Sequence, residues 1–214
     1  MALVIKGSSS GQITLDVPAA AGTNTLTIPA STGTVALTSQ LAGTIVKSSH
    51  AELTAIVTGS GAFTNITGLE AAITPASTSN KILLLATGSV GIATTTTSCA
   101  FRFTENDAAV GIGDPSSSRD RASFKIQSSS LNASQNFVGS CILSPNSTST
   151  LTYRVQIEAD AEGSFAVNRS FNLSNSTDSS HAVTSSYLHV FELDGSNVTI
   201  STYEILWILK ENLK

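Results

Sequence analysis

Hydrophobic and polar residues alternate most regularly over residues 150–158, which read TLTYRVQIE. The apolar positions on one side of an extended chain are Leu151, Tyr153, Val155 and Ile157. Successive side chains of a β-strand point to opposite faces, so this stretch predicts a strand with one buried and one solvent-facing side. A sheet that contains such a strand needs a second layer to cover its apolar face.

Similar patterns return along the rest of the chain. The run KILLLA at residues 81–86 is apolar almost throughout and predicts a strand buried on both faces. Residues 98–105 alternate, with Cys99, Phe101 and Phe103 facing inward if Arg102 faces water. Strand patterns follow one another closely with no convincing helix between them, which indicates an all-β, antiparallel sandwich or jelly roll. Further strands are predicted at residues 44–47, 53–57, 69–74, 108–113, 121–127, 137–138, 141–143, 165–167 and 187–193, with turns at residues 59–61 and 194–195.

A short internal repeat occupies residues 1–40. The sequence VPAAAGT at residues 17–23 returns as IPASTGT at residues 28–34. Each copy is an alternating strand that ends in an apolar residue, followed by Pro-Ala and a glycine turn. Such strands are too short to bury a core alone. We therefore expect them to stack on copies from neighbouring chains, which predicts an oligomer.

The patterns divide the chain into three parts. We expect a β-repeat segment at residues 1–42, a β-sandwich or jelly-roll-like head at 43–194, and an apolar tail at 195–214. The tail reads ILWIL at residues 205–209, around Trp207. An exposed stretch of this kind would aggregate, so either this chain's own sandwich or another chain must cover it. Residues 203–214 fit a strand and a short helix equally well.

Composition narrows the range of partners. Only 12% of the 214 residues are charged, and the formal net charge is −4. Nucleic-acid binding rests on clustered Lys and Arg, so we expect no nucleic-acid partner. We find neither a signal segment at the start nor a run that approaches a membrane span. We therefore expect folding in a cytoplasm, without membrane insertion.

Cys99 and Cys141 are the two cysteines of the chain. Two cysteines are too few for a disulfide framework. Each lies in an apolar strand pattern, so we expect buried free thiols. A disulfide between the two remains an open alternative.

The N-terminal residues also carry a family resemblance. Residues 11–19, 22–30 and 32–38 read GQITLDVPA, GTNTLTIPA and TGTVALT, and they resemble a short repeat in virion structural and fibre proteins of marine tailed phages, cyanophages especially. The segment from about 43 to 193 resembles the globular domain that often follows this repeat. Its similarity rests on SNKIL at 79–83, GIGD at 111–114, RDRASF at 119–124, VNRS at 167–170 and YLHVFE at 187–192.

This resemblance implies a homotrimeric fibre or knob subunit of a phage virion, assembled in the host cytoplasm. Residues 1–42 would trimerise and attach, and the β-rich head would face the host. The implied partners are other virion proteins of the tail, baseplate or capsid, together with a host surface glycan or protein.

No arrangement of residues predicts an enzyme. The histidines, His50, His181 and His189, lack the spacing of a metal site, and nucleophile and phosphate-binding motifs are missing from the sequence. Carboxylates two residues apart, which could serve glycosidic cleavage, are Glu158, Asp160 and Glu162, and also Glu105 and Asp107. Residues 105–107 or 158–160 could hold calcium if other oxygens converged on them. Carboxylates at a strand end are more often simply solvated. We therefore expect no catalytic residue, no metal and no cofactor.

A charged cluster at residues 114–121 is conspicuous in a chain with so few charges. Arginine forks bind carboxylates and carbonyls, so the cluster predicts a network within the loop or between chains; a solvent-facing loop is the alternative. The same two interpretations apply to residues 168–169. The candidate inter-chain contacts are Asp114, Arg119, Arg121, Asn168, Arg169 and Trp207.

The function expected from these observations is a virion structural protein that contributes to host attachment. A surface rich in Ser and Thr can bind sugars through hydroxyls and amides with few ions. A capsid decoration or a connector between fibre and tail, with no receptor, is the alternative. A glycan depolymerase is a third hypothesis, which the missing catalytic pattern disfavours.

Overall fold

The computed structural model describes residues 3–6, 10, 12–15, 45–93, 98–127, 133–160, 163–172, 182–196 and 198. The chain divides into two compact units, Met1–Leu37 and Thr38–Lys214. In the first unit, β1 (Leu3–Lys6) and β2 (Gln12–Leu15) pair antiparallel, with Leu3 opposite Leu15. The other predicted strands of the repeat and most of the apolar tail, Trp207 included, lie outside the described residues.

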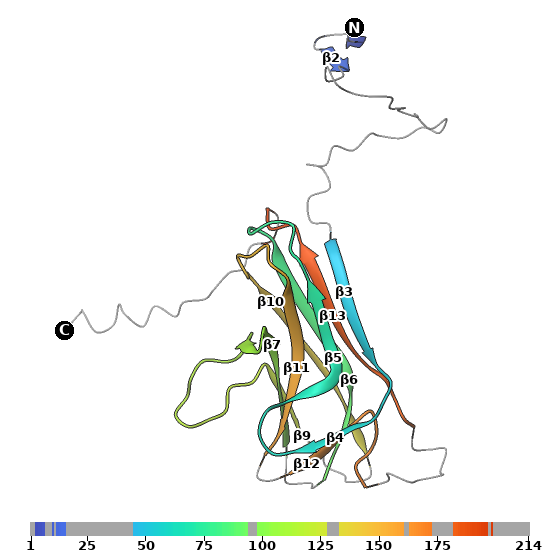
Figure 1. The fold of residues 1–214 in the computed structure, drawn as a ribbon, viewed down its shortest axis with the longest axis vertical. Helices are drawn as coiled ribbons and strands as arrows, with labels where there is room; N and C mark the ends of the chain where they lie inside the picture. The colour runs from blue at the N-terminus through green and yellow to red at the C-terminus, as the bar shows by residue number, and fades with distance from the viewer. Residues whose placement is uncertain are drawn as a thin grey trace, which may run out of the picture. The chain divides into compact units, whose positions relative to one another are not determined.

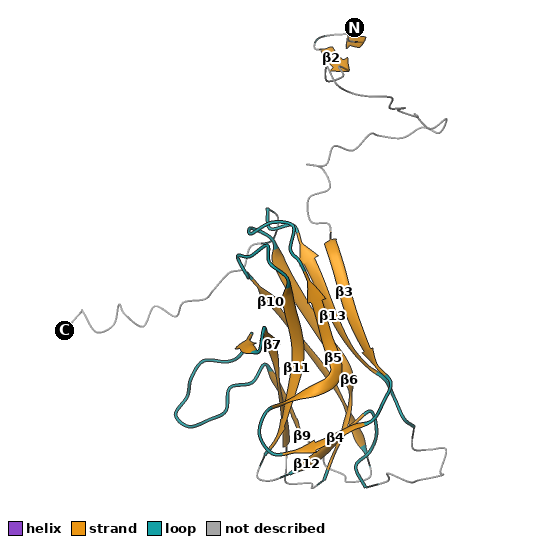
Figure 2. Ribbon diagram, viewed as in Figure 1, coloured by secondary structure: helices purple, strands orange, loops and turns teal. Residues whose placement is uncertain are grey.

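The described residues of the second unit form strands, turns and loops, with no helix among them (Figures 1 and 2). All strand pairs are antiparallel and make two sheets, an arrangement consistent with a β-sandwich. The prediction of an all-β, antiparallel fold is confirmed. The strands are β3 (Ile45–Leu53), β4 (Val57–Ser60), β5 (Thr64–Ile73), β6 (Lys81–Ile92), β7 (Ser98–Glu105), β8 (Ala108–Val110), β9 (Phe124–Gln127), β10 (Ser134–Leu143), β11 (Leu151–Ala159), β12 (Ser164–Val167) and β13 (Ser186–Leu193).

The six-stranded sheet is organised around β6, which has 12 residues. One edge of β6 pairs with β10 over nearly its whole length. Its other edge pairs first with β13 and then, near Ile92, with β12. β3 extends the sheet beyond β13, and β4 extends it beyond β12. A single long strand therefore holds both halves of this sheet together.

The five-stranded sheet is organised around β11 and β7. β11 lies between β5 and β7. The far edge of β7 is shared: β9 pairs with its first half and β8 with its second half. Between β8 and β9 the chain leaves the sheet in a long loop over residues 111–123 (Figure 1).

The core lies between the two sheets and is filled by alternate residues of each strand. Leu151, Tyr153, Val155 and Ile157 are buried, as their alternation predicts. Phenylalanines from both sheets meet in the middle: the ring centroids of Phe101 and Phe124 lie 4.9 Å apart, and those of Phe101 and Phe137 lie 4.7 Å apart. Other fully buried side chains are Phe103, Ile82, Leu84, Val90, Ile92, Phe165, Leu188 and Val190.

Glycine makes room for these rings at one point of close approach. Gly139 of β10 faces the core, and the Phe124 ring lies flat above its backbone. A Cβ at this position would overlap the ring atoms of Phe124. Protein interiors are packed at the density of organic crystals, so such an overlap cannot be absorbed without moving the aromatic cluster.

Two details of the predicted strands are wrong. Residues 53–57 do not form a strand of their own: β3 continues to Leu53, and β4 begins only at Val57 and contains Gly59, which was predicted as a turn. The run 81–86 is also not buried on both faces, because Leu83 and Leu85 are only half buried while Ile82 and Leu84 are fully buried. The second layer covers one side of β6 there and leaves the other side open.

The close approach at Gly139 gives a testable prediction. Gly139→Ala is expected to lower the free energy of unfolding by about 1–3 kcal/mol, because its methyl group overpacks the aromatic cluster. Gly113→Ala is the matched control, since the nearest atom to a Cβ there is 4.0 Å away. Urea unfolding followed by circular dichroism measures both. Equal stability of the two variants would contradict the packing described here.

Candidate functional site

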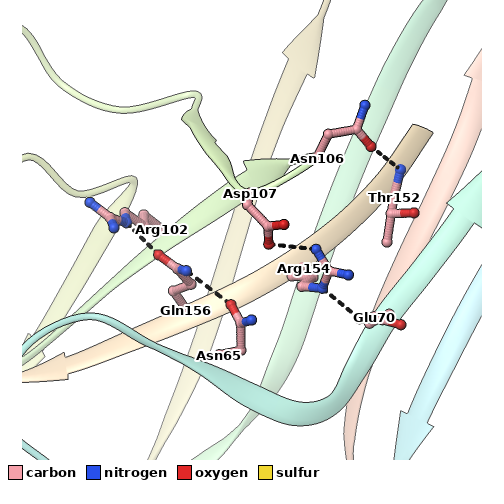
Figure 3. Close-up of polar contacts among 8 residues, drawn as sticks. All are labelled: Asn65, Glu70, Arg102, Asn106, Asp107, Thr152, Arg154 and Gln156. Atoms are coloured by element: carbon pink, nitrogen blue, oxygen red, sulfur yellow. Dashed lines mark hydrogen bonds and ion pairs between the residues drawn. The ribbon is translucent and has the colours of Figure 1, made fainter.

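A polar surface covers the outer side of the five-stranded sheet. Because alternate residues of β11 face the core, Arg154 and Gln156 face outward. The register of β11 with β5 and β7 surrounds each of them with polar neighbours. We call this surface the polar face. Its residues are Asn65, Glu70, Arg102, Asp107, Arg154 and Gln156 (Figure 3).

Arg154 is held by carboxylates on both sides. Its Nε donates to Glu70 Oε2 at 2.5 Å, and its Nη1 donates to Asp107 Oδ1 at 2.6 Å (Figure 3). Hydrogen bonding to Glu70 raises the pKa of the guanidinium, so it stays charged. Asp107 reaches this position from the tight turn after β7, where Asn106 and Asp107 adopt φ of 47° and 70°. The turn is pinned to β11 by the bond from Thr152 N to Asn106 Oδ1, at 3.0 Å.

A second row lies one step further along the strands. Arg102 Nε donates to Gln156 Oε1 at 2.7 Å, and Gln156 Nε2 donates to Asn65 Oδ1 at 2.9 Å (Figure 3). The guanidinium carbon of Arg102 lies 4.0 Å from the centroid of the Phe63 ring, a cation–π contact. The three strands thus present a connected row of planar polar groups next to an aromatic ring.

An irregularity of β5 opens a hollow in this surface. Arg154 pairs with Glu70 and Gln156 with Asn65, so residues 66–69 lie opposite Val155 alone and form a bulge. The hollow has a volume of about 350 Å³. It is lined by Asn65, Ile66, Thr67, Gly68, Glu70 and Arg154.

Carboxylates gather at the other end of the outer surface of this sheet. Burial, the charge of Asp120 and then that of Asp160 raise the pKa of Glu158. Asp160 accepts hydrogen bonds from Lys125 Nζ at 2.8 Å and from Ser98 Oγ, and these bonds lower its pKa. An open hollow of about 440 Å³ lies beside Asp160. The fold therefore brings Glu158 and Asp160 into one cluster, with Asp120 from the long loop.

The outer side of the six-stranded sheet has the opposite character. Val138 and Ile142 of β10 are 68% and 43% exposed. The register aligns them with outward side chains of β6 and β13. The rings of Tyr187, His189 and Phe191 stack in one stripe, with neighbouring centroids 6.0 and 5.9 Å apart. We call this surface the apolar face. Its residues are Leu83, Leu85, Val138, Ile142, Tyr187, His189 and Phe191, and the polar Thr87 and Ser140 lie between them on the same side.

Asp114, Arg119 and Arg121 lie in the exposed loop between β8 and β9. Arg121 Nε donates to the backbone oxygen of Gly113 at 2.6 Å, which ties the two sides of the loop together. The ion pairs among the described residues lie elsewhere, at Lys125–Asp160, Arg154–Glu70 and Arg154–Asp107. The inter-chain contacts predicted for these loop residues stay predictions.

Asn168 lies inside the chain, where it is fully buried. Its Nδ2 donates to the backbone oxygens of Leu53 and Ala55, each at 2.8 Å, and its Oδ1 accepts from Ser186 Oγ at 2.6 Å. Its backbone N donates to Ser89 O at 2.9 Å. Asn168 also has a φ of 70°, which Asn tolerates better than most residues. The residue therefore joins β3, β6, β12 and β13 to one another.

Arg169 is half buried, and its Nη1 donates to the backbone oxygens of Ser170 and Phe171, each at 2.7 Å. Its guanidinium thus supports the loop that follows β12. Trp207 lies outside the described residues. The inter-chain contacts proposed for Asn168, Arg169 and Trp207 stay predictions.

The described residues offer little reactive chemistry. Cys99 and Cys141 are free thiols, and burial raises the pKa of each to about 12, so both stay protonated. No group of three or more His, Cys, Asp or Glu side chains in the described part of the chain could hold a metal ion. Within that same part, no helix has the length and apolar character needed to cross a bilayer.

Most of the polar face was not identified from the sequence. The alternation of β11 places Arg154 and Gln156 on the solvent-facing side of the strand, but it does not show which residues contact them. Asn65, Glu70 and Asp107 come from other parts of the chain and meet Arg154 or Gln156 only through strand pairing. The available signal was the outward position of polar residues on several strands, which becomes informative only when the strand order is known.

Together, the fold and these surfaces define an all-β protein whose two-layer sandwich has one polar and one apolar outer face. Comparison with the models of known protein families gives no match, and a search of curated proteins finds no relative.

The hydrogen bonds of Asn168 predict a large cost for a small change. Asn168→Asp is expected to lower the free energy of unfolding by about 2–4 kcal/mol, because it turns a carboxylate oxygen toward the backbone oxygens of Leu53 and Ala55. Asn146→Asp is the matched control, since Asn146 also has a positive φ, of 51°, but is exposed. We expect the control to change stability by less than about 0.5 kcal/mol. Urea unfolding at pH 7 measures both, and a similar loss in the two variants would contradict the internal role of Asn168.

The carboxylate cluster predicts a dependence on pH. Because the folded-state pKa of Glu158 is raised, ionised Glu158 opposes folding, and stability falls as pH rises above the unfolded pKa. Glu158→Gln is therefore expected to stabilise the protein at pH 7, by at most about 1 kcal/mol after solvent screening. At pH 3.5, where the carboxyl is largely protonated, the two proteins should be equally stable. Urea unfolding at both pH values tests this, and a variant that is less stable at pH 7 would show that attraction to Arg102 dominates.

Proposed function

We propose that this chain is a structural subunit of a phage virion, a homotrimeric fibre or knob protein that contributes to host attachment. The observation that carries the proposal is the apolar face of the six-stranded sheet. A strand face left open to water normally carries polar side chains. Here Leu83, Leu85 and Ile142 lie side by side on paired strands, next to the stacked rings of β13.

The charge of the apolar face suits contact between identical chains. Its members include no Lys, Arg, Asp or Glu, so two copies can meet there without burying an unpaired ion of these types. Glu52 stands at its border, and its carboxylate accepts a hydrogen bond from the Tyr187 hydroxyl at 2.9 Å. Extended apolar patches on soluble proteins mark interaction surfaces. A subunit of a multi-copy assembly has such a partner in its own copies.

The other parts of the chain fit the same proposal. The repeat at residues 1–42 would trimerise the chains and attach them to other virion proteins, and the sandwich, a jelly-roll-like head, would be displayed on the particle. The resemblance to fibre proteins of marine phages supports this arrangement. The polar face is the surface left for a host ligand, which favours attachment over a purely architectural role.

The apolar face gives a direct test of assembly. Ile142→Glu and Val138→Glu are expected to shift the equilibrium between trimer and monomer toward monomer, even though the repeat still joins the chains, because each would bury an unpaired carboxylate in the interface. Ile56→Glu is the matched control: Ile56 is 42% exposed, close to the 43% of Ile142, but it lies in the link before β4 and is not one of the residues of the apolar face. Mass photometry of the full chain at micromolar concentration measures the result. A wild-type monomer, or an Ile142→Glu variant that dissociates no more readily than wild type, would overturn the proposal.

Adsorption separates attachment from the alternatives. Labelled wild-type protein is expected to sediment with marine cyanobacterial cells. A trimer that adsorbs to none of the strains tested would instead support a capsid decoration or a connector between fibre and tail.

A further inference from the structure

The bulge of β5 gives the polar face a built depression. Ile66 and Leu69 are both anchored in the core, at 2% and 0% exposure, so the backbone between them must arch outward. The arch contains Thr67 and Gly68, and Gly68 has a φ of 95°, a conformation that suits glycine. β-bulges often re-aim side chains next to binding sites. The hollow beneath the arch is therefore a consequence of core packing, and its shape is fixed by buried side chains.

The side chains that line the hollow are pre-positioned and only partly used. Arg154 is 21% exposed, and its bonds within the described residues use Nε and Nη1, which leaves Nη2 for a ligand. Glu70 accepts through Oε2, and Asn65 accepts through Oδ1. Glu70 Oε1 and Asn65 Nδ2 have no partner in the described part of the chain. The hollow thus offers both donors and an acceptor, and the hydrogen bonds of Arg154, Glu70 and Asn65 hold these groups in place.

A buried hydroxyl lies on the other side of Arg154. Thr104 of β7 is paired with Arg154 and is fully buried. Its Oγ1 makes no hydrogen bond to any residue that the structure describes. Because β11 lies between β5 and β7, Thr104 and the hollow are on opposite sides of Arg154, and Thr104 is not among the residues that line the hollow. Thr104 therefore serves as a control position, next to Arg154 but outside the hollow.

The charges identify the ligand class. Arg154 and Arg102 balance Glu70 and Asp107, so the surface has no net charge with which to select a phosphate, a sulfate or an acidic sugar. Sugar hydroxyls both donate and accept, which matches the unused donors of Arg154 and Asn65 and the unused acceptor of Glu70. A volume of about 350 Å³ accommodates a small polar ligand. We propose that the hollow formed by Asn65, Thr67, Glu70 and Arg154 is a binding site for a neutral, hydroxyl-rich glycan.

This inference deepens the proposed role in host attachment by naming the ligand class and its site, and it rests on that role for its biological meaning. The two can fail separately. A monomeric protein that binds neutral glycan overturns the trimer and leaves the site standing. A trimer that binds no neutral glycan overturns the site and leaves the trimer standing.

The test uses the full chain on an array of neutral hexose and N-acetylhexosamine oligosaccharides, with a matched set of uronic-acid and sulfated oligosaccharides. We expect binding to members of the neutral set and none to the acidic set. Titration calorimetry with the best neutral oligosaccharide then compares variants. Asn65→Ala, at an exposed position, and Arg154→Lys, which keeps the charge but loses the fork, should each weaken binding at least tenfold. Thr148→Ala, an exposed change in the loop between β10 and β11, should leave affinity unchanged.

Thr104→Val separates contact with the ligand from a change in the sheet beside Arg154. The substitution keeps the shape and removes a hydroxyl that lies outside the hollow, so the melting temperature should stay the same or rise while glycan affinity stays the same. Equal affinity of wild type and Asn65→Ala, or an equal fall in affinity in Asn65→Ala and Thr104→Val, would overturn the proposal. Failure to bind any neutral oligosaccharide, or preference for the acidic set, would overturn it as well.

Discussion

A strand can give only alternate side chains to a core that lies on one side of it. In this sandwich, β6 and β11 each send every second residue inward, where Ile82, Leu84, Tyr153 and Val155 are almost completely buried. The aromatic cluster of Phe101, Phe124 and Phe137 closes the space between the sheets. The remaining half of each strand has no second layer over most of its length, although the segment after β12 covers β6 at Ser89 and Gly91. Core packing therefore does not determine which residue types stand at these outward positions, and these residues can serve binding or assembly.

The two sheets use this freedom in opposite ways. On the five-stranded sheet, the outward positions carry Arg154 and Gln156, which tie the strands together through charge-assisted and amide hydrogen bonds. On the six-stranded sheet, the corresponding positions carry Leu83, Leu85 and Phe191. Polar cross-strand rows tolerate water, and apolar rows gain free energy by leaving it. One chain thus combines a surface suited to polar ligands with a surface suited to packing.

Much of the fold follows from local alternation. The face assignments of β7 and β11 could be predicted because Cys99, Phe103 and Tyr153 each follow a polar residue in a regular pattern. The continuous apolar run in β6 was wrongly predicted to be buried on both faces for a physical reason. Apolar residues on an uncovered face look the same in sequence as residues buried between two layers. The internal roles of Asn168 and Glu192 could not be predicted at all. Asn168 binds Leu53 and Ala55, and Glu192 accepts from Asn80 Nδ2 at 2.6 Å, so both depend on segments far away in the chain. The neighbours of Arg154 could not be predicted for the same reason, because Glu70 and Asp107 come from distant parts of the chain.

The ends of the sandwich lie on neighbouring strands. β3 starts at Ile45 and β13 finishes at Leu193, and these two residues are paired across the sheet. Domains whose termini lie close together are readily inserted into, or exchanged between, longer chains. Everything between the two residues can therefore be replaced as a cassette, with little change in the path of the flanking polypeptide. A pulling force applied to the segments before β3 and after β13 would break the hydrogen bonds between these two strands one after another, before it strained the other strands.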